Sequence, residues 1–212
     1  MTTKLSVQMG AWLDGSAIPT AHAFGKPGVD GPFDFGGNRS PAIAWSDAPE
    51  GTRSFVILCH DPDVPSSGED VNQAGKTVPA ELPRVDFFHW VLIDVPSATR
   101  EIAEGSASQG ITARGKAIGA TAHGVTGKND YTNWFASDAD MSGTYGSYDG
   151  PCPPWNDSIV HHYHFTVYAL DVETLGLTGE FTGQDVQKAM QGHILAQAAH
   201  VGTYSMNPAV KA

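Results

Sequence analysis

Three apolar segments of this sequence are typical of β-strands, and each lies beside a cluster of polar side chains. The segments span residues 54–59, 88–95 and 163–170 and are rich in β-branched and aromatic residues. The polar clusters occupy residues 59–65, 87–90, and 150–154 together with 161–165. A fold that aligns the three strands therefore brings carboxylates, imidazoles and a phenol into one pocket.

Composition places the chain among ordinary globular proteins. Its 212 residues are most simply one domain, residues 1–212, and 41% apolar residues suffice for a large core. The net charge of -11 and the lack of a Lys/Arg cluster argue against nucleic-acid binding. The sequence has neither a signal-peptide core nor a run of about 18 apolar residues. We therefore expect a soluble, cytoplasmic protein without an integral membrane segment.

The two cysteines lie in different settings. Cys59 belongs to an apolar run, Cys152 stands among prolines, and the sequence contains no C-x-x-C motif. We therefore expect neither a disulfide framework nor a structural zinc site, and no other cofactor is indicated.

Several strands without long intervening helices predict a mainly β fold, an antiparallel β-sandwich or barrel. Weaker strand candidates lie at residues 4–9, 42–45 and 111–113. One amphipathic C-terminal α-helix is predicted from Thr182 to the residues before Gly202. Thr182 is a suitable N-cap, Asp185 follows in the first turn, and apolar residues then recur at helical spacing.

Two connections between the predicted strands are unusually long. Residues 66–86 are longer than the roughly 12 to 15 residues above which structureless loops are uncommon, so this segment is a candidate rim or lid. Residues 124–158 carry a set of aromatic side chains, Tyr131, Trp134, Tyr145, Tyr148 and Trp155. These rings either wall a pocket or pack onto the sandwich.

Strand alternation selects candidate site residues near residue 161. His161 and Tyr163 share one face of the predicted strand, whereas His162 and His164 share the other. We take the first pair as site candidates. The His162-x-His164 spacing suits a metal ion, but no third ligand lies near in sequence, so we favour solvent exposure for this pair.

Asp61 and His89 are the other candidates. Asp61 and Asp63 flank a proline, and a rigid turn is predicted where their strand ends. An aspartate there either caps its own backbone or points into a site. His89 needs a hydrogen-bond partner, and Asp61 is a natural one that would raise the His89 pKa and let the ring bind an anion. A purely structural Asp–His pair is the alternative.

The motifs together resemble a known family. They lie at residues 38–41, 49–52, 61–65, 88–96, 150–154, 161–171, 188–196 and 202–204. In order and spacing they are similar to the phosphatidylethanolamine-binding protein family, most closely to its bacterial Raf-kinase-inhibitor-like branch. The resemblance covers nearly the whole chain.

The resemblance implies a β-sandwich of the phosphatidylethanolamine-binding type with a C-terminal helix and long pocket-rim loops. Its pocket is expected to accept phosphate, acetate or a phosphorylated headgroup. The ligand-binding residues implied by motif position are Asp61, Asp63, Phe87, His89, Gly150, Cys152, Pro153, His161 and Tyr163. Imidazole N–H groups, the Tyr163 hydroxyl and backbone N–H groups of the proline-rich elbow are the expected donors.

The sequence departs from the family pattern at two places. His162 stands where the family usually has an arginine, so the ion pair of that arginine is in doubt. The long connection at residues 66–86 leaves access to the pocket and ligand size open.

Three functions from different classes remain. The first is a regulatory protein that binds a small anion or a phospholipid headgroup. For this function a protein kinase is a candidate partner, and a homodimer is a candidate assembly. The second is a hydrolase that uses Asp61, His89 and His161 as acid–base groups. The third is a protein–protein interaction module with a vestigial pocket. No activated nucleophile is evident, so we favour binding and assign no catalytic residue.

Overall fold

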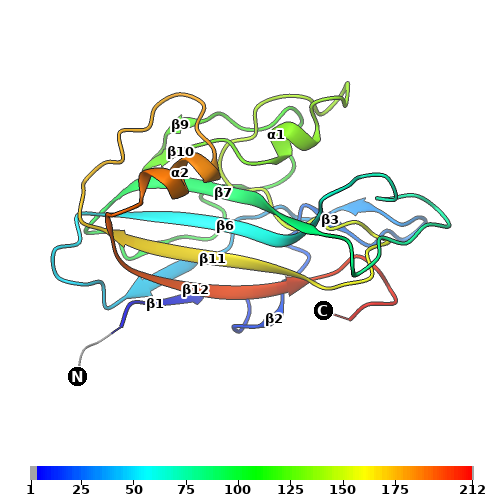
Figure 1. Cartoon of the computed structure of the whole chain (residues 1–212), viewed down its shortest axis with the longest axis horizontal. Helices are drawn as coiled ribbons and strands as arrows, with labels where there is room; N and C mark the ends of the chain where they lie inside the picture. Colours follow the sequence, from blue (N-terminus) through cyan, green and yellow to red (C-terminus); the bar gives the residue numbers. More distant parts are fainter. Residues whose placement is uncertain (1–3, 212) are drawn as a thin grey trace.

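A computed structural model describes residues 4–211 and is built mainly from β-strands (Figure 1). The largest sheet has seven strands, and every neighbouring pair is antiparallel except the parallel pair β12 and β2. In spatial order the strands are β2 (Ser16–Ala17), β12 (Ile194–Tyr204), β11 (His161–Leu170), β6 (Ser54–Pro65), β7 (Arg84–Pro96), β10 (Val125–Thr126) and β9 (Gly119–Ala120).

Two smaller sheets accompany the large one. The three-stranded sheet contains β1 (Ser6–Met9), β5 (Ile43–Ser46) and β8 (Glu101–Ile102). The two-stranded sheet pairs β3 (Gly25–Lys26) with β4 (Asp34–Phe35). The expected antiparallel sandwich is thus confirmed, because the main core lies between the large sheet and the three-stranded sheet.

Alternation along β6 divides its side chains between two cores. Phe55 and Ile57 pack into the main core with Trp45 of β5, while Val56 and Leu58 belong to a second core on the opposite face. Helix α2 (Gly183–Ala189) covers part of that second face. A second short helix, α1 (Tyr131–Trp134), lies in the long aromatic connection. Within residues 4–211, neither helix is long and apolar enough to cross a bilayer.

The three central strands are confirmed and lie side by side in the order β11, β6, β7. The turn predicted at residues 61–65 is wrong, because β6 continues through this segment and pairs with β7 across register shifts. The weaker candidates at 4–9 and 42–45 correspond to β1 and β5. The strand predicted at 111–113 is absent, since irregular backbone runs there between two glycines with positive φ.

The predicted C-terminal helix is correct at its start and wrong in its extent. Thr182 caps α2, and a capping box joins it to Asp185. The helix ends at Ala189, and Gly192 follows with a φ of 84°, a left-handed conformation that a helix cannot continue. The rest of the predicted helix is the strand β12, which pairs with β11 along its length.

Candidate functional site

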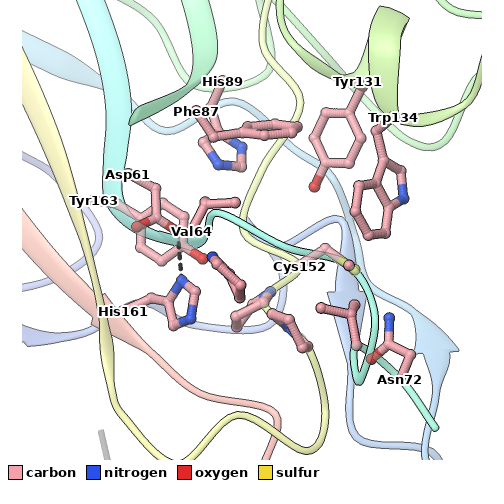
Figure 2. A pocket seen from close by; sticks show the side chains of 15 residues that line it. Asp61, Val64, Asn72, Phe87, His89, Tyr131, Trp134, Cys152, His161 and Tyr163 are labelled. Atoms are coloured by element: carbon pink, nitrogen blue, oxygen red, sulfur yellow. Dashed lines mark hydrogen bonds and ion pairs between the residues drawn. The ribbon is translucent and has the colours of Figure 1, made fainter. Parts of the chain in front are cut away.

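A small pocket lies at one end of the large sheet, beside the end of β6 and the starts of β7 and β11 (Figure 2). Its cavity volume is about 90 Å³. Asp61 of β6, His89 of β7, and His161 and Tyr163 of β11 contribute its polar groups. The remaining lining residues are mainly apolar: Val64, Pro65, Gly68, Val71, Asn72, Phe87, Tyr131, Trp134, Cys152, Pro153 and Pro154. The fold therefore gathers residues that are far apart in the sequence.

Most of the residues expected at the site line this pocket. They are Asp61, Phe87, His89, Cys152, Pro153, His161 and Tyr163. Asp63 lies outside the lining and bonds with His162. Gly150 lies behind the pocket, where its N–H donates to Asn38 and its carbonyl accepts from the Tyr131 hydroxyl.

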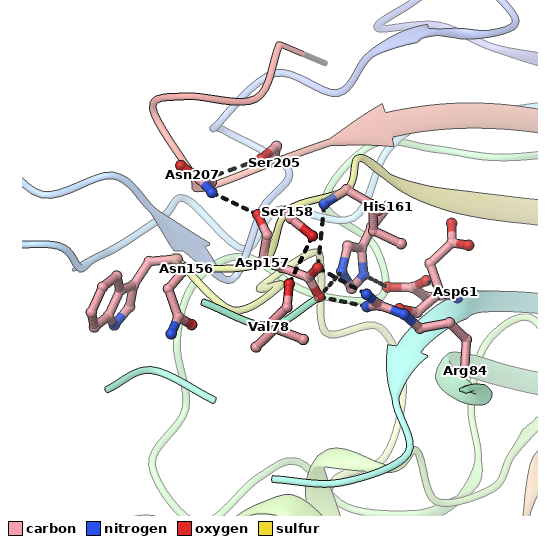
Figure 3. A network of polar contacts seen from close by, with 12 residues as sticks. Asp61, Val78, Arg84, Asn156, Asp157, Ser158, His161, Ser205 and Asn207 are labelled. Atoms are coloured by element: carbon pink, nitrogen blue, oxygen red, sulfur yellow. Dashed lines mark hydrogen bonds and ion pairs between the residues drawn. The ribbon is translucent and has the colours of Figure 1, made fainter. Parts of the chain in front are cut away.

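Asp61 and His161 line one side of the pocket and belong to a chain of charged groups that continues behind the lining to Asp157 and Arg84 (Figure 3). We call these four residues the pocket floor. His161 Nδ1 lies 2.7 Å from Asp61 Oδ2, and its Nε2 lies 3.1 Å from Asp157 Oδ2. Burial alone would lower the pKa of His161, but hydrogen bonds and charges of Asp157 and Asp61 outweigh it and raise the pKa to about 9. His161 is therefore an imidazolium whose two N–H groups both donate to carboxylates.

Arg84 neutralises the far end of the pocket floor. Its guanidinium bonds Asp157 through two nitrogens, at 2.6 and 3.1 Å. The same group donates to the backbone carbonyls of Asp63 and Pro79, so it also fixes the start of β7 and the connection before it. Burial would raise the pKa of Asp157, but the hydrogen bonds from His161 and Arg84 lower it. Two negative and two positive groups thus balance within the floor.

The opposite side contains His89, whose partner is not the one expected. The predicted pairing of His89 with Asp61 is wrong, because Asp61 bonds with His161, and His89 Nδ1 lies 2.9 Å from the backbone carbonyl oxygen of Asp149. Burial lowers the pKa of His89 to about 4, against the raising effects of the Asp61 charge and the Asp149 carbonyl. The predicted rise of this pKa is also wrong, and the ring is neutral at pH 7.

A buried network holds the carbonyl that contacts His89. The Asp149 carboxylate accepts hydrogen bonds from Asn38, Asn129 and Lys116. We call His89, Asp149 and these three partners the pocket wall. Sequence reasoning missed the supporting residues. Their signal was weak, an asparagine in each of the turn-like segments 36–40 and 127–130.

Tyr163 is fully buried, and its Oη makes no hydrogen bond within residues 4–211. Burial first, and then the nearby Asp61 charge, raises its pKa well above the ordinary value, so the phenol keeps its proton. Buried polar groups are normally paired with protein, water or a ligand. Tyr163 therefore places a donor within the pocket lining, with the Asp61 carboxylate close to it.

The other face of β11 carries separate contacts. His162 Nδ1 lies 2.8 Å from Asp63 Oδ2, and the His162 side chain is 49% exposed. His164 stacks on His60 of β6 with ring centroids 5.2 Å apart. In the part of the chain that the structure describes, no group of three or more His, Cys, Asp or Glu side chains could hold a metal ion.

Both long connections contribute to the pocket rim. The first supplies Gly68, Val71 and Asn72. Asn156 anchors this connection, because its side chain accepts from the Asn72 N–H and donates to the carbonyls of the same loop. The second supplies Tyr131 and Trp134, whereas Tyr145 and Tyr148 are buried in the cores. The aromatic residues of this connection therefore do both things expected of them: some line the pocket and others pack in the cores.

The chemistry available in the pocket is limited. Cys152 lines it, but burial raises the pKa of its thiol to about 12, which leaves no thiolate nucleophile at neutral pH. Both nitrogens of His161 are engaged with carboxylates. Within residues 4–211, the Oη of Tyr163 is a buried atom without a hydrogen-bond partner, and His89 bonds through Nδ1, which leaves its Nε2 available.

Comparisons with known proteins agree with this architecture. A family model described as phosphatidylethanolamine-binding protein matches residues 8–205. The UPF0098 protein YbhB of Escherichia coli is 31% identical over 192 residues, which cover 91% of this chain and 94% of that protein. A UPF0098 protein of Aquifex aeolicus is 36% identical over 169 residues, 80% of this chain and 75% of the relative.

A solved structure is similar over nearly the whole chain. It is that of Escherichia coli YbcL, described as a new member of the mammalian PEBP family. The TM-score is 0.68 at 25% sequence identity, and the match covers 96% of this chain and 99% of that one. The similarity thus extends from the sequence motifs to the arrangement of the sheets.

Proposed function

Because this chain belongs to the phosphatidylethanolamine-binding protein family, we propose that its pocket binds a small oxyanion such as phosphate, acetate or a phosphorylated headgroup. The observation that carries the proposal is the hydroxyl of Tyr163, which has no hydrogen-bond partner within residues 4–211 and lies fully buried in the lining of a pocket that also contains the ring of His89, bonded through Nδ1 alone. A bound ligand would satisfy both groups.

The size of the pocket supports a headgroup rather than a whole lipid. Sites for drug-sized molecules enclose roughly 300–1,000 Å³. The cavity here measures about 90 Å³. A phosphate-sized group fits this space, and any larger part of the ligand lies outside, along the apolar rim that includes Val71 and Trp134.

The charges of the pocket also support the proposal. An acidic protein with aspartates in its pocket would repel an anion if those carboxylates were unpaired. Here His161 bridges Asp61 and Asp157, and Arg84 pairs with Asp157. Of these groups Asp61 and His161 line the pocket, so a ligand meets a carboxylate that is already paired with an imidazolium.

Calorimetry with phosphate and phosphoethanolamine tests the proposal. Tyr163→Phe removes the buried donor, and hydrogen bonds to charged groups contribute about 1.5–3 kcal/mol, so affinity should fall about tenfold or more. Tyr168→Phe is the matched control, because Tyr168 lies on the other face of the same strand and packs in the second core. Absence of binding to the unaltered protein, or equal binding by Tyr163→Phe, would contradict the proposal.

A hydrolase is the second candidate, since His89 Nε2 is a free base in the pocket. General bases work best when their pKa lies near the operating pH. Burial lowers the pKa of His89 to about 4, so it is a weak base at pH 7. We expect no turnover of aryl phosphates or phosphodiesters above background. Turnover that disappears in a folded His89→Ala variant would favour the hydrolase.

These features favour binding without turnover. We propose, from the family resemblance, that the protein is regulatory and of the kinase-inhibitor-like kind, with the bound state of the pocket rather than a reaction as its output.

A further inference from the structure

The pocket wall fixes which nitrogen of His89 carries hydrogen. Its Nδ1 lies 2.9 Å from the backbone carbonyl oxygen of Asp149, and a carbonyl oxygen can only accept. Nδ1 must therefore carry the hydrogen, and in the neutral ring Nε2 is left as an acceptor. Only 3% of His89 is exposed, and this residue lines the pocket. The pocket thus presents an acceptor to its ligand.

An acceptor in the pocket discriminates between ligand oxygens according to whether they carry hydrogen. An oxygen that carries charge but no hydrogen is repelled by the Nε2 lone pair and offers it no hydrogen bond. An oxygen that carries a hydrogen donates to the same lone pair. Tyr163 complements this arrangement, because its unpaired hydroxyl can donate to a second, unprotonated ligand oxygen.

We propose that the pocket selects oxyanions that carry their own proton, namely phosphate and phosphomonoesters in their monoanionic form, over sulfates and phosphodiesters. The inference rests on the proposed function and specifies its ligand class. The P–OH group donates to His89 Nε2, and an unprotonated phosphate oxygen accepts from the Tyr163 hydroxyl. A phosphodiester has the charge but lacks the P–OH hydrogen.

Methyl phosphate and methyl sulfate provide a matched test. At pH 5.5 methyl phosphate is mainly a monoanion, because the second pKa of a phosphomonoester is about 6. Methyl sulfate has nearly the same size and the same charge but no hydrogen on its oxygens. His89, whose pKa is about 4, is still neutral at this pH. Methyl sulfate can bind once His89 is protonated, which at pH 5.5 costs about 1.5 pKa units, so calorimetry on the unaltered protein should give affinity for methyl phosphate about 30-fold above that for methyl sulfate.

Two further ligands and one variant complete the experiment. Dimethyl phosphate should bind as weakly as methyl sulfate, and inorganic phosphate should bind like methyl phosphate. Tyr163→Phe should weaken methyl phosphate and methyl sulfate by the same factor, because the selectivity comes from His89. A ratio of methyl phosphate to methyl sulfate affinity below tenfold, or a ratio that collapses in Tyr163→Phe, would overturn the inference.

Failure of the inference differs from failure of the proposed function. If no oxyanion binds, the proposed function is removed and the inference with it. If methyl phosphate and methyl sulfate bind equally well, the pocket is an anion site and only its selectivity for protonated ligands is lost.

Discussion

The pocket floor and the pocket wall each hold a buried histidine, yet the two rings differ in charge. His161 lies between the carboxylates of Asp61 and Asp157, which raise its pKa to about 9 against the effect of burial. His89 bonds a neutral backbone carbonyl, and burial lowers its pKa to about 4. Burial disfavours the charged form of both rings. Only full carboxylate charges next to a ring reverse that effect.

The difference separates two tasks within one pocket. The charges of the floor balance one another, because every charged group in it has a partner of opposite charge. The wall presents one neutral ring to the pocket, that of His89, because its charged pair of Lys116 and Asp149 lies outside the pocket lining. A mutation in the floor should therefore change stability first, and one in the wall should change ligand selection first.

Of the changes considered, removal of Asp157 should reduce the free energy of unfolding most, because it disrupts the pocket floor. Asp157→Ala leaves Arg84 without its partner and removes one carboxylate from His161. Breaking a buried ion pair by deleting one partner costs about 3–5 kcal/mol. Urea unfolding at pH 7 should show a loss of that size. Asp140→Ala, an exposed aspartate of the aromatic connection, is the control and should change little. A loss below about 1 kcal/mol for Asp157→Ala would mean that the floor charges are not coupled.

Alkaline pH should remove the contribution of His161 to stability. Its folded pKa of about 9 lies above the ordinary 6.5, so the contribution is complete below pH 6.5 and is lost as pH rises through 9. Across this window the free energy of unfolding should fall by about 3 kcal/mol. Urea titrations between pH 6.5 and 9.5, with NMR titration of the imidazole, measure it. His161 titrating near 6.5 would contradict the assignment.

Acid pH should act on His89 in the opposite direction. Its folded pKa of about 4 lies below 6.5, so its contribution is complete above pH 6.5 and decreases as pH falls toward 4. The expected loss is again about 3 kcal/mol, and protonation of Asp157 adds to it at lower pH. The summed contribution of the two histidines is therefore maximal near pH 6.5. In a folded His89→Gln variant the decrease between pH 6.5 and 4 should become shallower; an unchanged slope would assign it to other groups.

The strands and the pocket lining could be predicted because both follow local patterns. Runs of β-branched and aromatic residues identify β6, β7 and β11, and alternation places His161 and Tyr163 on one face. The predicted extent of the C-terminal helix was wrong, also for a local reason. The apolar residues keep helical spacing into β12, but the backbone at Gly192 has a positive φ that no helix can continue through.

The hydrogen-bond partners could not be predicted, since loops supply them from far along the chain. Asp157 meets Arg84 across 73 residues, and Asp149 meets His89 across 60. No periodicity links such positions. Choosing between His89 and His161 as the partner of Asp61 required the register of all three strands, because both neighbouring strands of β6 carry a histidine near it.

A third histidine, His162, extends the comparison to an exposed ring, and its removal should change stability least. His162, like His161, lies beside a carboxylate, with Nδ1 2.8 Å from Asp63 Oδ2, but its side chain is 49% exposed. Exposed ion pairs contribute about 0–1 kcal/mol, because water screens the charges and solvates each partner alone. His162→Ala should therefore change the free energy of unfolding by less than about 1 kcal/mol. Its phosphate affinity should equal that of the unaltered protein, since His162 points away from His161 and Tyr163. Urea unfolding and calorimetry measure the two quantities in the same preparation. A loss above 2 kcal/mol would mean that a carboxylate partner, rather than burial, decides how much a histidine of this strand contributes to stability.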